Sequence, residues 1–187
     1  MTHENMIPDD VMTQLLAEIN SDPEHAVIRM QDLVQLYRDD ARLPFLHGSV
    51  LAGLGHFTQA HQKMREAVGM APDYALARFQ LGLLELTSGD GGAAQRTWAS
   101  LRDLPADNPF KLFVDGLLHM IRDEFPEAMR LLQEGIERNT ELPALNKDMS
   151  MLVLEMAQKM KVVPDEPQFE SDANFLLKQF SFKPTKH

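Results

Sequence analysis

The sequence predicts an all-α fold, a solenoid of antiparallel helix pairs that ends in a capping helix. Small and large apolar residues recur along the chain at an interval of 34 residues, which accommodates two helices of ordinary length and their turns. With 44% hydrophobic and 25% charged residues, the composition is that of a soluble globular protein. Near the C-terminus, apolar residues follow helical spacing. A chain of 187 residues with these features can bury a sizeable core.

Four sets of residues share the 34-residue register. They are the glycines Gly48, Gly82 and Gly116, the phenylalanines Phe45, Phe79 and Phe113, the alanines Ala26, Ala60, Ala94 and Ala128, and the large residues Met64, Trp98 and Leu132. A small residue on each helix of a pair lets the two helices cross closely. We therefore expect a larger side chain at Gly48 or Ala60 to overpack that crossing.

The register divides residues 1–161 into units of the solenoid. In order, the predicted elements are a degenerate unit (7–40), three clear units (41–74, 75–108 and 109–142), a capping helix (143–161), and a linker with an apolar tail (162–187). The degenerate unit keeps Ala26, Met30 and Leu33 and contains the turn Asn20-Ser21-Asp22-Pro23. Asp followed by Pro is a typical start of a helix, so we expect this turn to cap the next one.

The capping helix carries more apolar residues than one buried face needs. Its main apolar face holds Leu145, Met149, Leu152, Met156 and Met160, but Met151 and Leu154 lie off that face. The outer face of a terminal repeat is normally polar. We therefore expect the chain's own tail, a second copy or a ligand to cover this helix. The tail residues predicted to make such contacts are Phe169, Phe175, Leu176 and Phe180.

The repeated motifs resemble those of the tetratricopeptide repeat (TPR) family over most of the chain. The unit 41–74 has the turn Leu54-Gly55-His56-Phe57 and a closing Pro72, and the next unit has Leu81-Gly82. In the unit 109–142, Asp115 replaces the usual leucine and Thr140 the usual proline. The resemblance implies a helical superhelix that binds other polypeptides.

The resemblance also implies a concave groove lined by the first helix of each unit. The corresponding positions in this sequence are Arg42, Phe45, Ser49, Leu76, Phe79, Gln80, Leu83, Leu86, Phe110, Phe113, Leu117 and Met120. Family members that clamp a terminal carboxylate use several basic residues there, whereas only Arg42 is basic here. We expect an apolar groove for an apolar segment of a partner. The alternative is that the three phenylalanines pack between repeats and never meet a ligand.

Charge and composition exclude several functions. The net charge is −10, and residues 1–40 hold nine acids against two bases, which disfavours nucleic acid and anionic membrane surfaces as partners. Asp39 and Asp40 are interpreted as helix-end or solvated acids. With no cysteine, no apolar run of spanning length and no signal-like start, a cytoplasmic protein is expected.

The sequence carries no motif for catalysis, a metal or a cofactor, so we expect none of these. The seven histidines lack metal-ligand spacing. The favoured function is a non-catalytic adaptor or chaperone that binds an apolar segment of another protein. In architecture and charge, the chain resembles small three-repeat secretion chaperones of bacteria. The alternatives are an assembly subunit, as a homodimer or in a hetero-oligomer, and a regulatory subunit of an enzyme.

Overall fold

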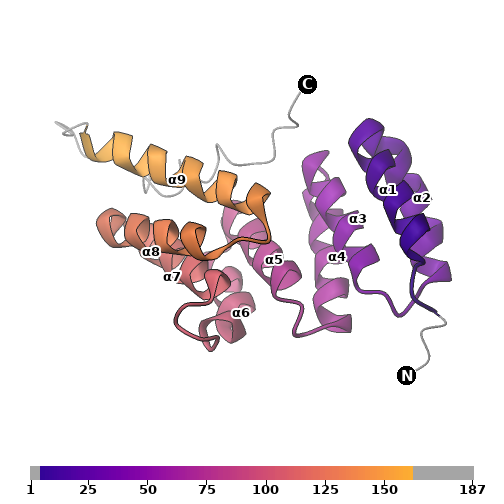
Figure 1. Cartoon of the computed structure of the whole chain (residues 1–187), viewed down its shortest axis with the longest axis horizontal. Coiled ribbons are helices and arrows are strands. Elements are labelled where there is room, and N and C mark those ends of the chain that lie inside the picture. The colour runs from indigo at the N-terminus through magenta and orange to yellow at the C-terminus, as the bar shows by residue number, and fades with distance from the viewer. Residues whose placement is uncertain (1–4, 162–187) are drawn as a thin grey trace. The chain divides into compact units, whose positions relative to one another are not determined.

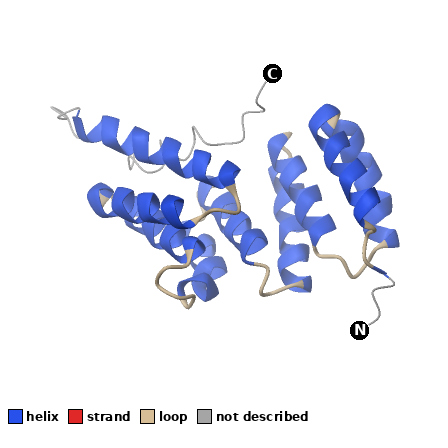
Figure 2. Ribbon diagram, viewed as in Figure 1, coloured by secondary structure: helices blue, strands red, loops and turns tan. Residues whose placement is uncertain are grey.

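A computed structural model describes residues 5–161, and in this range the chain forms nine helices and no strand (Figures 1 and 2). The helices are α1 (Asp9–Ser21), α2 (Pro23–Leu36), α3 (Arg42–Gly53), α4 (Phe57–Met70), α5 (Ala75–Thr87), α6 (Gly91–Arg102), α7 (Pro109–Ile121), α8 (Phe125–Arg138) and α9 (Pro143–Lys161). The predicted all-α fold class is confirmed.

The helices follow the repeat ranges predicted from the sequence. Each range from 7–40 to 109–142 contains one consecutive pair, and α9 begins at Pro143. The described residues form two compact units, the first ending at Leu84 and the second beginning at Glu85, within α5. Residues 162–187, with Phe169, Phe175, Leu176 and Phe180, lie outside the described range, so the contacts predicted for the tail stay predictions.

The 34-residue register has the structural cause inferred from the sequence. A Cβ atom added at Gly48 would lie 2.8 Å from Cγ of Met64 and 3.0 Å from the backbone oxygen of Ala60. One added at Gly116, two periods later, would lie 2.8 Å from Cδ2 of Leu132. The same crossing therefore recurs in α3 with α4 and in α7 with α8. This confirms the predicted close approach at Gly48 and Gly116.

The large residues of the register lie in the core of their helix pairs. Met64, Trp98 and Leu132 are fully buried, and so are the alanines four residues before them. In the first compact unit, which ends at Leu84, apolar residues of α1, α2 and α3 form one cluster around Leu15 and Met30. Regular burial of this kind explains why the sequence period was so clear: each period supplies the same buried positions.

Local capping sets where several helices begin. The Asp22 side chain accepts a hydrogen bond of 3.1 Å from the backbone N–H of His25, with Pro23 at the first helical position, so the predicted cap of α2 is confirmed. Asp90 caps α6 in the same way through the N–H of Ala93 at 2.8 Å. These caps satisfy backbone donors that have no partner inside the helix.

Asp40, interpreted from the sequence as a helix-end or solvated acid, precedes α3 but is fully buried. Its carboxylate accepts two bonds from the Arg42 guanidinium, at 2.9 and 2.6 Å, and one from the N–H of Ile7 at 3.2 Å. Burial by itself would raise the pKa of Asp40, but the hydrogen bonds from Arg42 and Ile7 outweigh it and hold that pKa below its usual range. The solvated interpretation was wrong because these donors replace water.

Candidate functional site

None of the twelve residues predicted to line a concave groove is fully exposed. The buried ones are Phe45, Phe79, Leu86, Phe113, Leu117 and Met120, and the half-buried ones are Arg42, Ser49, Leu76, Gln80, Leu83 and Phe110. The groove floor predicted from Phe45, Phe79 and Phe113 therefore lies inside the protein. All three phenylalanines are buried, and the binding role of the twelve residues stays a prediction.

The contacts of two phenylalanines explain their burial. A Cβ atom at Gly135 of α8 would lie 2.6 Å from Cε1 of Phe113, so the ring of Phe113 lies directly on the backbone of the neighbouring helix. The ring of Phe45 meets that of Tyr74 edge to face, with 5.2 Å between the ring centroids. Side chains held in this way stabilise the helix pairs and present little surface to a ligand.

A different groove opens in the first unit, above α3 and between α2 and α4. It consists of two adjoining pockets of about 260 and 290 Å³ that share Val34 and Gln35. We call it the α2–α4 groove. Its lining residues are Val27, Gln31, Val34, Gln35, Tyr37 and Arg38 on the α2 side, Asp40, Pro44, His47 and Leu51 below, and Gln59, Gln62, Lys63, Glu66 and Met70 on α4.

The lining residues follow helical spacing, which gives the groove two parallel walls. Residue numbers on α2 and on α4 rise together from the first pocket to the second, whereas those on α3 fall from Leu51 to Pro44. The walls therefore run in the same direction and the floor runs against them. From Val27 to Gln35 the α2 wall measures about 12 Å along the helix axis, at 1.5 Å per residue.

His47 lies in the floor of the α2–α4 groove and is the most unusual residue of the site. Only 3% of its surface is exposed, and its Nδ1 atom is buried without a hydrogen-bond partner. Burial, assisted by the charge of Lys63, lowers the pKa of His47. The imidazole is therefore neutral at pH 7 and holds an unused hydrogen-bonding position at the base of an open groove.

Four glutamines, Gln31, Gln35, Gln59 and Gln62, stand on the walls of the groove and are exposed. Within residues 5–161, their carboxamides make no hydrogen bond to other protein groups. Most charged groups of the lining are paired with neighbours. Lys63 Nζ lies 2.9 Å from Glu66, and Asp40 is paired with Arg42. Arg38, in the second pocket, donates to the backbone oxygen of Gln35. The first pocket thus offers free amide groups rather than free charge.

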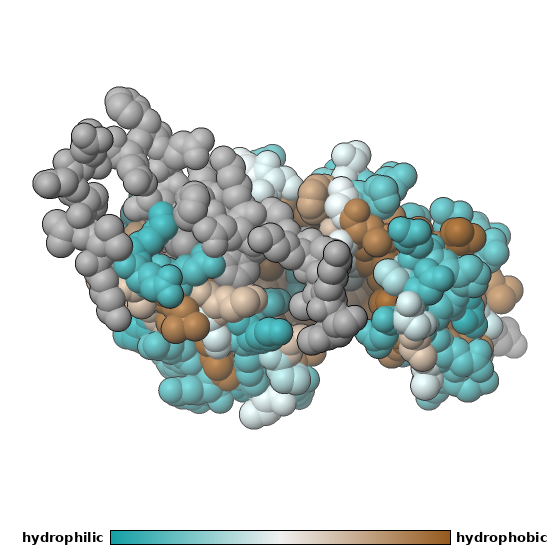
Figure 3. Space-filling model, turned by 90° about the horizontal axis from the view of Figure 1, so that it is seen from above, coloured by the Kyte–Doolittle hydropathy of each residue, from teal (hydrophilic) through white to brown (hydrophobic). Residues whose placement is uncertain are grey.

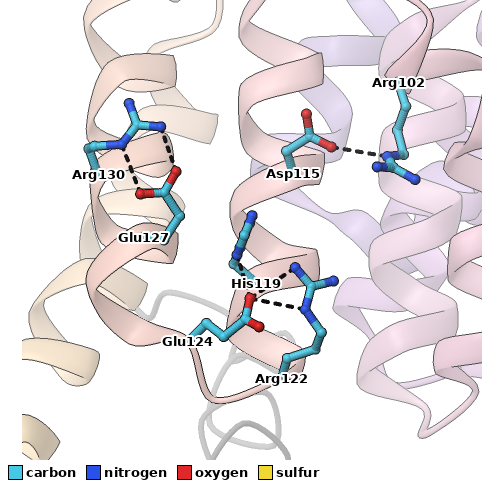
Figure 4. A network of polar contacts seen from close by, with 7 residues as sticks. All are labelled: Arg102, Asp115, His119, Arg122, Glu124, Glu127 and Arg130. Atoms are coloured by element: carbon cyan, nitrogen blue, oxygen red, sulfur yellow. Dashed lines mark hydrogen bonds and ion pairs between the residues drawn. The ribbon is translucent and has the colours of Figure 1, made fainter.

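In the second compact unit, which begins at Glu85, the side chains at the repeat positions equivalent to these groove residues bond to one another. Two periods after Gln59 and Gln62 are Glu127 and Arg130, whose closest atoms are 2.6 Å apart (Figure 4). Two periods after His47 is Asp115, which accepts a bond of 3.0 Å from Arg102 of α6 (Figure 4). These side chains satisfy each other, so the free glutamines of the first unit are a local departure from the pattern.

The polar groups of the second unit do not form a catalytic arrangement. His119 Nδ1 lies 2.5 Å from Glu124, and Arg122 binds the same carboxylate at 3.0 Å (Figure 4). These pairs are largely solvated, and such pairs contribute little to stability. Among the described residues no three His, Asp or Glu side chains gather as metal ligands would, and no helix is both long and apolar enough to cross a bilayer.

The exposed apolar residues of α9 are a second surface feature. Met151 and Leu154, predicted to be covered, keep 37% and 61% of their surface exposed, and Met160 keeps 50%. On the face drawn in Figure 3, the described residues are mainly hydrophilic, with apolar residues in separate patches.

The sequence prediction missed His47, although a signal for it exists. The residue before the repeat glycine is Leu81 in one unit, but His47 and Asp115 in the units on either side. The departure at Asp115 was recognised and that at His47 was not. A polar residue at a position that normally holds a buried leucine marks a place where the repeat serves something besides packing.

Comparison with known proteins supports the fold class. No family model matches the sequence, and no curated protein matches it either. Among solved structures, the chain is similar to MamA from residue 41 to the end, from Desulfovibrio magneticus RS-1, with a TM-score of 0.56 at 14% identity over 80% of this chain and 90% of that one. A MamA RS-1 ArsTM double mutant matches with a TM-score of 0.57 at 13% identity, over 80% and 83% of the two chains.

These neighbours are helical solenoids of TPR type, so the described fold is TPR-like. At such low identity, the likeness concerns the path of the backbone and not the side chains. The residues of the α2–α4 groove therefore have to be interpreted from their own chemistry.

Proposed function

We propose that the protein is a non-catalytic interaction module, a cytoplasmic adaptor or chaperone that holds a segment of a partner protein in the α2–α4 groove. The observation that carries this proposal is the buried Nδ1 of His47, which has no hydrogen-bond partner in the groove floor. A buried polar atom without a partner costs about 1–3 kcal/mol of stability. A protein keeps such a cost most readily where a ligand relieves it.

The rest of the groove supports binding rather than catalysis. The neutral His47 has neither a nucleophile nor a carboxylate in hydrogen-bond contact among the described residues, and general-base chemistry needs such a partner. The groove walls supply amide groups and apolar side chains instead. A TPR-like scaffold keeps the walls in place, because α2 and α4 both pack on α3.

Replacing His47 by Leu is expected to stabilise the fold and weaken binding together. Leu81 occupies the same repeat position one period later, so leucine suits this position. The substitution also removes the nitrogen that has no hydrogen-bond partner. We expect a gain of about 1 kcal/mol, or roughly 2–4 °C in melting temperature. Affinity for peptides selected on the wild-type protein should fall about threefold to tenfold. Calorimetry and fluorescence anisotropy measure the two effects.

The pH dependence provides the control for His47→Leu. Because the pKa of His47 is lowered in the folded state, the unfolded state takes up a proton first as the pH falls below about 6.5. Wild-type stability should thus decrease from pH 7 to pH 5 more than that of the variant. A variant that is less stable than the wild type at pH 7 and binds peptide equally well would refute the proposed role. Failure to select any peptide on the wild-type protein would refute the function itself.

The exposed apolar residues of α9 favour one alternative, an assembly subunit. Replacing Leu154 by Glu would then dissociate an oligomer without lowering the melting temperature, because this side chain is mostly exposed. Ile28→Glu, at an equally exposed residue of α2, is the matched control. Sedimentation velocity measures the outcome. A monomer in all three proteins, the wild type included, would exclude this alternative.

A further inference from the structure

The walls of the α2–α4 groove have the hydrogen-bonding character of a peptide backbone. Gln31 and Gln35 lie four residues apart on α2, so their side chains lie one above the other along that wall. Gln59 and Gln62 stand on the opposite wall, on α4. Each carboxamide both donates and accepts. An extended chain between these walls presents N–H and C=O groups on both of its edges, which matches what the glutamines offer.

The floor of the groove has room for an apolar side chain. Val34 and Leu51 are buried and Val27 is half-buried, and all three line the first pocket beside His47. In an extended segment, alternate side chains point to opposite sides. One side chain can therefore enter this floor while its neighbours point out of the groove.

The compensated charges disfavour a strongly charged ligand. Lys63 is paired with Glu66 and Asp40 with Arg42. Arg38 lines only the second pocket, where its exposed guanidinium donates to the backbone oxygen of Gln35. In the first pocket, a charged ligand group would have to displace the pair of Lys63 and Glu66. An uncharged segment meets no such competition.

We infer that the α2–α4 groove binds an extended, uncharged polypeptide segment through its backbone, with one apolar side chain of that segment on Val27, Val34 and Leu51. This inference rests on the proposed function and adds the chemistry of the ligand. The α2 wall of about 12 Å accommodates about four residues at 3.3 Å each. A hydrogen bond from this segment to Nδ1 of His47 would require the side chains of the floor to shift, because that atom is buried.

The second unit supplies the variant that tests this inference. Gln59→Glu with Gln62→Arg reproduces the pair Glu127 and Arg130, and Glu66 already occupies the position equivalent to Glu134, the second partner of Arg130. The two substituted side chains should form an ion pair along α4. The groove then loses two amide groups that could bind the segment. Because the second unit tolerates the same triad, we expect the fold to persist. The matched control is Gln14→Glu with Ala17→Arg, an equally spaced pair on the exposed surface of α1.

The probe is a set of heptapeptides, acetylated and amidated at their ends, chosen on the full-length wild-type protein from a random displayed library. We expect uncharged sequences to be enriched. The double variant on α4 should bind them at least tenfold more weakly, and the α1 control should bind them normally. Methylating the backbone nitrogens of the selected peptide should weaken binding to a similar extent. Affinity should change less than about twofold between low and high salt, because little charge is neutralised.

Several results would overturn the inference. Enrichment of charged peptides, a strong salt dependence or undiminished binding by the double variant would each do so, while the proposed function would still stand on the selected peptides. Tighter binding by the full chain carrying Phe175→Ser and Phe180→Ser would identify its own tail as the occupant. Loss of a dimer in the double variant would identify a second copy. If no peptide is selected at all, the inference and the proposed function fail together.

Discussion

Replacing Gly48 by Val is expected to lower the free energy of unfolding by about 3 kcal/mol. A Cβ atom at this position would lie 3.0 Å from the backbone oxygen of Ala60 and 3.1 Å from the backbone nitrogen of Met64. Backbone atoms of a packed helix cannot move aside as a flexible side chain can. The crossing of α3 and α4 must therefore widen, and the melting temperature should fall by roughly 6–12 °C in thermal unfolding followed by circular dichroism.

Gly69 provides the matched control for Gly48, because it lies in α4 and a Cβ atom there would meet nothing within 4 Å. Gly69→Ala should stabilise the protein by up to about 1 kcal/mol, since alanine is the better helix former. Opposite signs for the two variants would show that the crossing, and not helix propensity, governs Gly48. Equal melting temperatures for Gly48→Val and the wild type would refute the close packing of α3 on α4.

Asp40→Asn is expected to cost about 2 kcal/mol, the second largest effect among these variants. The buried carboxylate holds the Arg42 guanidinium with two bonds and also accepts the N–H of Ile7. An amide carries no charge and has one acceptor oxygen, so it satisfies fewer of these donors. The expected loss of stability is moderate because 41% of the Arg42 side chain is exposed and water can solvate its charge. Urea unfolding at neutral pH measures the change.

The pH dependence identifies the charge of Asp40 as the cause. Since the folded-state pKa of Asp40 is lowered, its contribution is complete above the unfolded value of about 3.9 and is lost as the pH falls through the lower folded value. Wild-type stability should decline below pH 4 more steeply than that of Asp40→Asn. The neighbouring Asp39→Asn keeps an acceptor oxygen for the exposed bond from Asn5 and removes only a solvated charge, so it should change stability by less than about 0.5 kcal/mol. A large effect there would contradict the special role of Asp40.

The register of the repeats could be predicted from the sequence because close crossings impose a strict local rule. Where two backbones approach to within contact of a Cβ atom, as at Gly48 and Gly116, only the smallest residue fits. These two constraints lie two periods apart at the same repeat position and remain visible without any structure. The same holds for the cap of α2, which depends on two residues three positions apart.

Burial could not be predicted from a position on a helix face alone. Phe113 occupies a groove position according to the family resemblance, yet its ring lies on the backbone of α8 because Gly135 leaves room for it. Asp40 is acidic and near a helix end, yet it is buried because Arg42 and Ile7 supply its hydrogen bonds. In both cases the outcome depends on a contact with another segment.

The sequence by itself determined the all-α class, the helix pairs and the positions where the helices cross, since these follow from residue size and spacing along one chain. Only the tertiary structure decided where a binding groove lies. The α2–α4 groove takes its walls from two helices and its floor from a third, so no single stretch of sequence contains it. Whether its glutamines are free or bonded depends on which side chains meet across helices, and the burial of His47 depends on the packing of α3 between its neighbours.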